Sequence, residues 1–361
     1  MKSINVLLND ISYPIWIKIN LIDRLPNLLS PLNNGQSWFL FTNEKLFLKY
    51  GKKLVNNLSS QNFKVNYILI NDNEDAKSLK NLETIFSKII KNKYDRSSVF
   101  ISLGGGVISD LIGFMAATFL RGIDYINIPT TLLSMVDSSI GGKTGINLIE
   151  GKNLVGAYWH PKAVIVDPNL LNTLPKREFV SAIGEIIKYG AIFDKKFLVF
   201  ISNNIDNIIN LKSKKLIEKI ITCCVKYKVK IVVDDERESD KRRILNFGHT
   251  VGHALELYCG LDKLRHGEAV AYGMIVAAKL SMKYAKLKLN EYNLLTSIIK
   301  KLPLPQLKNI NSSDVLNIMR RDKKNKKGVF NFILLNSLGS PKIINIIDDN
   351  KLIDCIDSIS Y

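Results

Sequence analysis

The chain has 361 residues, of which 46% are hydrophobic, and a formal net charge of +18 at pH 7. This apolar share is typical of a globular protein and excludes a disordered one. The longest uncharged apolar runs, such as 111–120, are about half the ~20 residues that a bilayer requires, and we expect no signal peptide at the N-terminus. The four cysteines form no Cys-x-x-Cys motif, which indicates reduced thiols and a cytoplasmic protein.

The positive charge does not by itself indicate a nucleic-acid-binding protein. The lysines are scattered and accompany many Asn and Ile residues, a combination that AT-rich codons favour. The basic runs at 212–215 and 322–327 contain no interleaved aromatic residues and match no nucleic-acid module. Solvated helix faces and loops explain the first run, and an anionic small substrate fits the basic excess at least as well.

The first half of the chain alternates short β-rich runs with helical segments. The runs 37–43, 64–72, 97–106, 125–131 and 163–168 end in polar or glycine-rich turns and predict strands. This alternation favours a parallel sheet covered by helices, as in a Rossmann-like α/β domain. Beyond residue 175 the periodicity is helical until 330–335, so we predict an α/β domain over 1–174 and a mainly helical domain over 175–361. A cleft between such domains is a natural ligand site.

A glycine-rich turn follows the third predicted strand. Gly104, Gly105 and Gly106 allow a ligand to approach the backbone, and the helix after them offers free N–H groups to a phosphate. Residue 109 is Ser, not the third Gly of the dinucleotide-binding fingerprint, so a tight turn without a ligand is an alternative.

The stretch SSIGGKTG at 138–145 looks like the end of a P-loop, but residue 137 is Asp where that motif requires Gly. With EGKNLVG at 150–156, it forms a glycine-rich region that holds Asp137, Lys143, Lys152 and Asn153. Lysines placed in this way indicate an anion site, although a plain surface loop is equally consistent with the pattern.

Further along, GEIIKYG places Glu185 and Lys188 three residues apart on one helical face. An exposed ion pair is the simplest interpretation. The neighbouring residues are apolar, however, and a carboxylate buried among them would need a cation or a metal ion.

Three of the four histidines, His249, His253 and His266, lie within eighteen residues of each other. Residue 250 is Thr, so this is not the HExxH motif of metalloproteases. Two histidines and one carboxylate would leave an open position on Zn²⁺, as Lewis-acid catalysis requires, and spacing alone selects His249 and His253 as the pair. Arg242 and Asn246 precede them at helical spacing, which predicts one polar stripe facing a ligand.

Taken together, these motifs resemble the 3-dehydroquinate synthase family of sugar phosphate cyclases over residues 40–340. The resemblance rests on SLGGGVISDLIGFMAATFLRGI, IPTTLLSMVDSSIGGKTGIN, EGKNLVGAYW, GEIIKYG, DERES, RRILNFGHTVGHALE, RHGEAVAYGM and MRRDKK. It implies a phosphate-eliminating lyase of the shikimate pathway, which serves aromatic amino acid biosynthesis. This enzyme converts 3-deoxy-D-arabino-heptulosonate 7-phosphate into 3-dehydroquinate by NAD-dependent oxidation, phosphate elimination, reduction and aldol closure. A homodimer that holds NAD and Zn²⁺ or Co²⁺ is implied as well.

The resemblance also assigns site residues, beginning with Glu185, His249 and His266 as metal ligands. It places His253 near the substrate instead, for hydrogen bonding or proton transfer. The implied NAD contacts are Asp72, Asn73, Glu74, Asp75, Ala76, Lys77, Gly105, Gly106, Val107, Ile108, Ser109, Asp110, Thr130, Thr131, Lys143, Lys152, Leu170, Leu171, Asn172 and Thr173. The implied substrate contacts are Asp137, Lys152, Asn153, Lys188, Lys228, Arg242, Asn246 and His253, together with Arg121 reaching the phosphate from the partner subunit and either Lys323 or Lys324.

Two departures from the family pattern fall in the predicted NAD loops. DNEDAK stands at 72–77 where DGEQYK is usual, and Ser109 replaces a Gly; either change could weaken NAD binding. The alternative functions are another sugar phosphate cyclase, or an NAD- and metal-dependent glycerol or alcohol dehydrogenase of the same architecture. A nucleic-acid-binding module would leave the glycine and histidine motifs unexplained.

Overall fold

The computed structural model describes residues 1–361 except 93, 261–262, 322–329, 347 and 360–361. The chain divides into two compact units. Unit 1 consists of Met1–Leu174 and Lys214–Arg237, and unit 2 consists of Pro175–Ser213 and Glu238–Tyr361. The chain first passes from unit 1 to unit 2 after Leu174, which is the predicted boundary. The prediction of one continuous second domain over 175–361 is wrong, because unit 1 also contains Lys214–Arg237. Helix α8 (Lys214–Asp234) belongs to unit 1, because it buries an apolar face against β1 (Lys2–Leu7) and the turn Ser134–Ser138.

Unit 1 is built on a seven-stranded sheet in the order β1-β2-β9-β6-β5-β3-β4. All neighbouring strands are parallel except β1 and β2, which form an N-terminal antiparallel hairpin that the sequence pattern did not predict. The strands are β2 (Ser12–Ile17), β3 (Ser37–Thr42), β4 (Lys64–Leu69), β5 (Val99–Gly104), β6 (Asp124–Pro129) and β9 (Ala163–Val166). The five predicted strands are β3, β4, β5, β6 and β9, so the prediction of a parallel sheet is confirmed.

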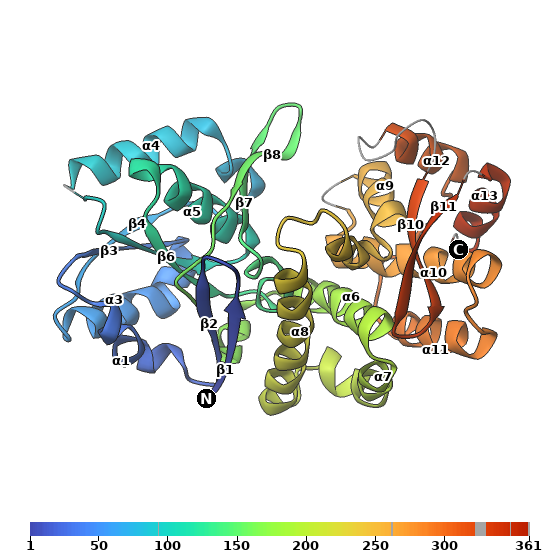
Figure 1. Cartoon of the computed structure of the whole chain (residues 1–361), viewed down its shortest axis with the longest axis horizontal. Helices are drawn as coiled ribbons and strands as arrows, with labels where there is room; N and C mark the ends of the chain where they lie inside the picture. Colours follow the sequence, from blue (N-terminus) through green and yellow to red (C-terminus); the bar gives the residue numbers. More distant parts are fainter. Residues whose placement is uncertain (93, 261–262, 322–329, 347, 360–361) are drawn as a thin grey trace. The chain divides into compact units, whose positions relative to one another are not determined.

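Helices cover both faces of this sheet, with α4 and α5 on one face and α1 and α3 on the other (Figure 1). Their bounds are α1 (Leu25–Leu29), α2 (Glu44–Leu46), α3 (Lys52–Ser59), α4 (Leu79–Lys91) and α5 (Gly106–Thr118). The strand order reverses direction between β3 and β5. In open α/β sheets, ligands bind beyond the carboxyl ends of the strands at such a reversal. The glycine-rich turn lies there, because it connects β5 to α5.

The lysine-containing glycine-rich region, which the sequence left open as a loop, is an antiparallel hairpin in the structure. It consists of β7 (Lys143–Leu148) and β8 (Gly151–Tyr158), and it packs on α5 (Figure 1). Glycines allow this packing, because a Cβ on Gly113 of α5 would lie 2.4 Å from Cγ2 of Thr144. A Cβ on Gly156 would lie 2.3 Å from the carbonyl oxygen of Thr144.

Unit 2 is mainly helical, as predicted, with α10 (His266–Tyr284) buried along most of its length. This helix packs against α6 (Lys176–Phe193), α9 (His249–Cys259), α11 (Leu289–Lys300) and the strand β10 (Phe330–Ser337). The remaining elements are α7 (Lys195–Ile209), α12 (Ser312–Arg321), β11 (Ser340–Ile346) and α13 (Asp349–Asp357). The strand predicted at 330–335 is β10, and β11 completes a hairpin with it.

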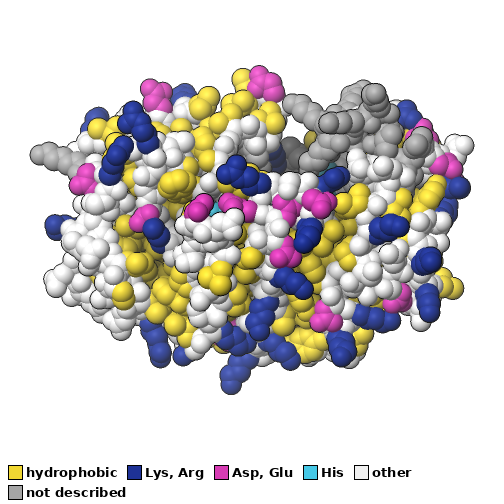
Figure 2. All heavy atoms as spheres, in the orientation of Figure 1, with side chains coloured by type: hydrophobic (Ala, Val, Ile, Leu, Met, Phe, Trp, Pro, Cys, Tyr) yellow, Lys and Arg dark blue, Asp and Glu magenta, His cyan; other side chains and the backbone are white. Residues whose placement is uncertain are grey.

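The distribution of charged side chains on the surface agrees with the interpretation that the lysines are scattered along the chain. On the visible face of each unit, Lys and Arg are interspersed with acidic, apolar and uncharged groups (Figure 2). Among the described residues, no helix combines the length and the apolar character needed to cross a membrane.

Candidate active site

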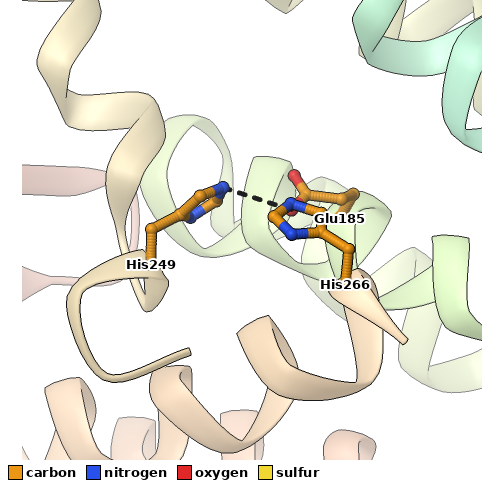
Figure 3. A group of neighbouring side chains, drawn as sticks. All are labelled: Glu185, His249 and His266. Carbon is orange, nitrogen blue, oxygen red and sulfur yellow. Dashed lines mark ion pairs between the residues drawn. The ribbon is translucent and has the colours of Figure 1, made fainter. Parts of the chain in front are cut away.

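Three side chains from three helices of unit 2 point toward one another (Figure 3). Glu185 lies in the middle of α6, and His249 and His266 are the first residues of α9 and α10. Nε2 of each histidine lies 3.5 Å from Oε1 of Glu185. Two ligand atoms about 2.1 Å from a tetrahedral Zn²⁺ would be about 3.4 Å apart. One carboxylate oxygen and two imidazole nitrogens at this spacing therefore fit a divalent metal ion of the zinc or cobalt kind.

The close approach of α6 and α10 depends on glycines that immediately adjoin these ligands. A Cβ on Gly184 would lie 2.3 Å from the carbonyl oxygen of Gly267, and a Cβ on Gly267 would lie 1.9 Å from that of Ser181. The hydroxyl of Ser181 also accepts a hydrogen bond from the backbone N–H of Gly267 at 3.1 Å. Because Gly184 precedes Glu185 and Gly267 follows His266, this backbone contact sets the distance between the two ligands.

Both imidazole rings present Nε2 to Glu185 because Nδ1 is engaged elsewhere. Nδ1 of His249 lies 3.2 Å from the carbonyl oxygen of Phe247, and Nδ1 of His266 lies 3.2 Å from Oε1 of Glu256. A carbonyl oxygen only accepts hydrogen bonds, so a neutral His249 carries its proton on Nδ1 and offers a lone pair on Nε2. Both oriented rings thus suit metal coordination.

Burial and neighbouring charges shift the pKa values of both histidines in this cluster. Glu185 is fully buried and forms an ion pair with Lys188 of the same helix, so the simplest interpretation, an exposed pair, is wrong and the alternative of a buried face is confirmed. Burial, and then the neighbouring Lys188, lower the pKa of His249 well below its usual value. Burial also opposes the charge on His266, but hydrogen bonds with Glu185 and Glu256 outweigh it and raise the pKa of His266 to about 10. Metal binding would release a proton, because ligand imidazoles are neutral.

The choice of His253 as a ligand from spacing alone does not match this geometry. His253 is absent from the group of possible ligands that Glu185, His249 and His266 form, and belongs to a second group with Glu256 and His266. The predicted helical stripe is wrong. Lys241–Asn246 is a 3-10 turn, and Gly248, with a φ of +80°, separates it from α9.

In unit 1, the predicted NAD residues follow the carboxyl ends of four parallel strands, except Lys143 and Lys152, which lie in β7 and β8. Asp72–Lys77 follows β4, 105–110 begins at the N-cap of α5 after β5, Thr130 and Thr131 follow β6, and Leu170–Thr173 lies in the turn after β9. Gly105 allows the loop after β5 to lie close to the loop after β6, because a Cβ on Gly105 would lie 2.9 Å from Cγ2 of Thr131. The carboxyl edge of a parallel sheet is where dinucleotides bind in this class of fold.

A hydrogen-bonded network joins the loop after β4 to the hairpin. The buried Nζ of Lys77 donates to Oδ2 of Asp110 at 2.7 Å and also to Asn153. Asn147 completes the network. Its backbone N–H donates to the carbonyl of Lys77 at 2.7 Å, its amide donates to Oε2 of Glu74 at 2.7 Å, and its Oδ1 accepts from the N–H of Asn153 at 2.9 Å. Sequence reasoning missed Asn147; its position in TGIN, six residues before Asn153, was the available signal.

The replacement of a usual Gly by Ser109 is accommodated inside unit 1. The Ser109 hydroxyl is buried and donates to the carbonyl oxygen of Gly105 at 3.0 Å, with Oδ1 of Asn127 in β6 at 3.2 Å. The additional polar group therefore has hydrogen-bond partners in the protein.

The remaining predicted substrate residues have different environments. Asp137 forms an ion pair with Lys228 within unit 1. In unit 2, Arg242 is buried, and the amide of Asn246 donates to Oε1 of Glu238 at 2.9 Å. Lys152 and Arg121 have exposed side chains, as does Lys143, which was predicted only as an NAD contact. Lys323 and Lys324 lie outside the described residues.

Comparison with known proteins places these observations in a family. Models described as the 3-dehydroquinate synthase N-terminal and C-terminal domains match residues 67–181 and 182–325. The 3-dehydroquinate synthase of Prochlorococcus marinus (strain AS9601) is 41% identical over 354 residues, which cover 97% of each chain. That of Buchnera aphidicola subsp. Cinara cedri is 40% identical over 362 residues, which cover 99% of this chain and 97% of the relative.

Solved structures share the fold at lower identity. A 2-deoxy-scyllo-inosose synthase complexed with carbaglucose-6-phosphate, NAD⁺ and Co²⁺ aligns with a TM-score of 0.88 and 23% identity over 99% of both chains. A glycerol dehydrogenase from Schizosaccharomyces pombe aligns with a TM-score of 0.70 and 15% identity over 96% of this chain and 88% of its own.

Proposed function

The chain belongs to the 3-dehydroquinate synthase family, and from this premise we propose that it converts 3-deoxy-D-arabino-heptulosonate 7-phosphate into 3-dehydroquinate and phosphate. The observation that carries the proposal is the convergence of Glu185, His249 and His266 with both Nε2 atoms facing the carboxylate. This cluster would hold Zn²⁺ or Co²⁺, and the loops at the carboxyl edge of the sheet in unit 1 would hold NAD⁺.

When bound, the metal ion would polarise a substrate oxygen, and NAD⁺ would accept a hydride and later return it. Oxidation of a ring hydroxyl to a ketone makes the adjacent C–H acidic, so phosphate can leave by β-elimination. Reduction of the ketone, ring opening and an internal aldol closure then give the carbocycle. The cofactor is unchanged at the end, which distinguishes this reaction from a dehydrogenase reaction.

The residues of this chain would bind and orient a substrate that carries a carboxylate and a phosphate. Fixed cations suit these two groups, and we assign this role to Lys152, Lys228 and Arg242, with Arg242 able to form a bidentate pair. His253 lies beside the ligand rings and would exchange protons or donate a hydrogen bond there. Lys188 would balance the charge of Glu185 and contact the substrate.

The decisive experiment is a phosphate-release assay on the heptulosonate phosphate, with and without NAD⁺ and a chelator. We expect release that depends on both the metal ion and NAD⁺, with no accumulation of NADH absorbance. Steady accumulation of NADH with an alcohol substrate would instead identify a dehydrogenase. Phosphate release that a chelator leaves untouched would contradict the metal assignment.

We further propose a homodimer in the cytoplasm, in which the exposed Arg121 of the partner subunit reaches the substrate phosphate. Mixing Arg121→Ala chains with His249→Ala chains tests this arrangement. Random pairing of two inactive variants should restore about a quarter of the wild-type rate if Arg121 acts across the dimer, because one site in each mixed dimer is intact. No recovery in verified mixed dimers would place Arg121 in its own subunit's site or outside it.

A further inference from the structure

Glu256 is an acidic side chain beside the metal cluster to which the family resemblance assigns no role. It lies on α9, seven residues after His249 and three after His253, so the helix presents all three on one face. Its Oε1 lies 3.2 Å from Nδ1 of His266, and its side chain is 17% exposed, so the contact is largely withdrawn from water.

We infer that Glu256 is a positioning residue that holds His266 as a metal ligand; this inference rests on the proposed function. An imidazole ring can coordinate through only the nitrogen that lacks a proton. The Glu256 carboxylate accepts hydrogen bonds, so it favours the proton on Nδ1 and leaves the lone pair on Nε2. Nε2 is the atom that faces Oε1 of Glu185 at 3.5 Å.

The two histidines support this assignment by comparison within the same site. His249 makes the equivalent contact from Nδ1, but to the backbone carbonyl of Phe247 at 3.2 Å, which the fold itself supplies. His266 is the first residue of α10 and receives this contact from a side chain on another helix instead. A substitution can therefore remove the orienting acceptor of His266 but not that of His249.

The packing of α9 on α10 keeps Glu256 within reach. A Cβ on Gly273 would lie 1.9 Å from the carbonyl oxygen of Gly248, and a Cβ on Gly252 would lie 3.1 Å from that of Ala269. These contacts fix the separation of the two helices close to the ligands. The His266 ring is also 35% exposed, so without Glu256 a water molecule could bond to either ring nitrogen and the preference for one tautomer would be lost.

The test compares Glu256→Ala and Glu256→Gln with the wild-type protein, using Co²⁺ as the probe. Titration of the metal-free protein, followed by the Co²⁺ absorption spectrum, gives the dissociation constant and the number of ions per chain. We expect Glu256→Ala to weaken Co²⁺ binding about 10- to 100-fold, with Glu256→Gln in between because its amide oxygen can still accept from Nδ1. Asp354→Ala is the matched control, since it removes an acidic side chain that pairs with Lys283 on the surface of unit 2.

A second measurement follows the Nδ1 proton of His266 directly and does not depend on activity. Long-range proton–nitrogen NMR of the zinc-loaded protein, labelled in its four histidines, should show the proton of His266 on Nδ1 in the wild type. A zinc ion bound to Nε2 keeps the proton on Nδ1 in Glu256→Ala as well, so in this variant we expect that proton of His266 to exchange faster with water, because it has lost its acceptor, while that of His249 is unchanged.

Each outcome has a defined meaning. Wild-type protein that binds no Co²⁺ would overturn the proposed function. Wild-type protein that binds one ion, with unchanged Co²⁺ affinity and unchanged exchange of the His266 Nδ1 proton in folded Glu256→Ala, would overturn only the role of Glu256. Two ions in the wild type and one in Glu256→Ala would make Glu256 a ligand of a separate ion with His253 and His266, and would also overturn the inference.

Discussion

Replacing Gly184 by Ala should separate the metal ligands without changing any of them. The added Cβ would lie 2.3 Å from the carbonyl oxygen of Gly267, whereas a carbon–oxygen contact needs about 3.3 Å. Helices α6 and α10 must therefore move apart by about 1 Å at this point. Glu185 adjoins Gly184 and His266 adjoins Gly267, so their separation should grow by a similar amount. Functional groups must be held within about 0.5 Å of the productive geometry.

We expect kcat/KM for phosphate release to fall about 100-fold, in line with the usual effect of a 1 Å misplacement. The Co²⁺ dissociation constant should rise in parallel. Overpacking costs about 1–3 kcal/mol of unfolding free energy, of which about 1 kcal/mol is offset because Ala favours a helix over Gly. Urea denaturation measures the net loss.

Gly190→Ala is the matched control, because it makes the same change in the same helix but meets α7. Its Cβ would lie 3.0 Å from Cα of Leu198, so a shift of a few tenths of an ångström is enough. We expect near wild-type metal affinity for this variant. If folded Gly184→Ala binds Co²⁺ and turns over substrate as the wild type does, then the glycine contact does not set the ligand spacing.

Three further changes test other parts of the site. His249→Ala should weaken metal binding by more than about 100-fold, as measured by metal analysis after dialysis, and normal turnover without bound metal would refute its assignment as a ligand. Arg242→Ala should raise KM for the anionic substrate roughly 10- to 150-fold, the equivalent of about 1.5–3 kcal/mol per charge-assisted hydrogen bond, and an unchanged KM and rate would count against the contact. Lys77→Met should weaken NAD⁺ binding in calorimetry. Burial already raises the pKa of Asp110 and Lys77 opposes it, so the folded variant should hold a proton on Asp110 more tightly than the unfolded chain does. The unfolding free energy of this variant should therefore fall as the pH rises above about 4, and a flat profile in urea denaturation would contradict the pairing.

Local sequence patterns were enough to predict five strands of the parallel sheet. The strands β3, β4, β5, β6 and β9 are apolar runs that end in polar or glycine turns, and strands buried on both faces have this composition. The β7–β8 hairpin was not recognised as such, because glycines at 145, 151 and 156 hide its strand character.

The metal site depends on contacts that no local pattern contains. Spacing selected His253, since residues four apart share a helical face, but it could not show that α6 supplies the carboxylate. That arrangement requires Gly184 and Gly267 to touch, although they lie far apart in the chain. The local patterns singled out Glu185 and the three histidines separately, and only the family resemblance joined Glu185, His249 and His266 into one set of ligands. The membership of α8 in unit 1 was missed for the same reason, because an amphipathic pattern does not specify which core buries it.

The placement of α8 has a consequence for biosynthesis. Unit 1 takes its last segment from Lys214–Arg237, after α6 and α7 of unit 2 have already been translated. During synthesis, α8 therefore cannot pack against β1 until the segment that ends at residue 237 has been translated. A nascent fragment that stops at Leu174 would expose the apolar surface that packs against α8, and this surface could then aggregate or bind chaperones. We therefore expect unit 1 to complete its folding only after part of unit 2 has been synthesised.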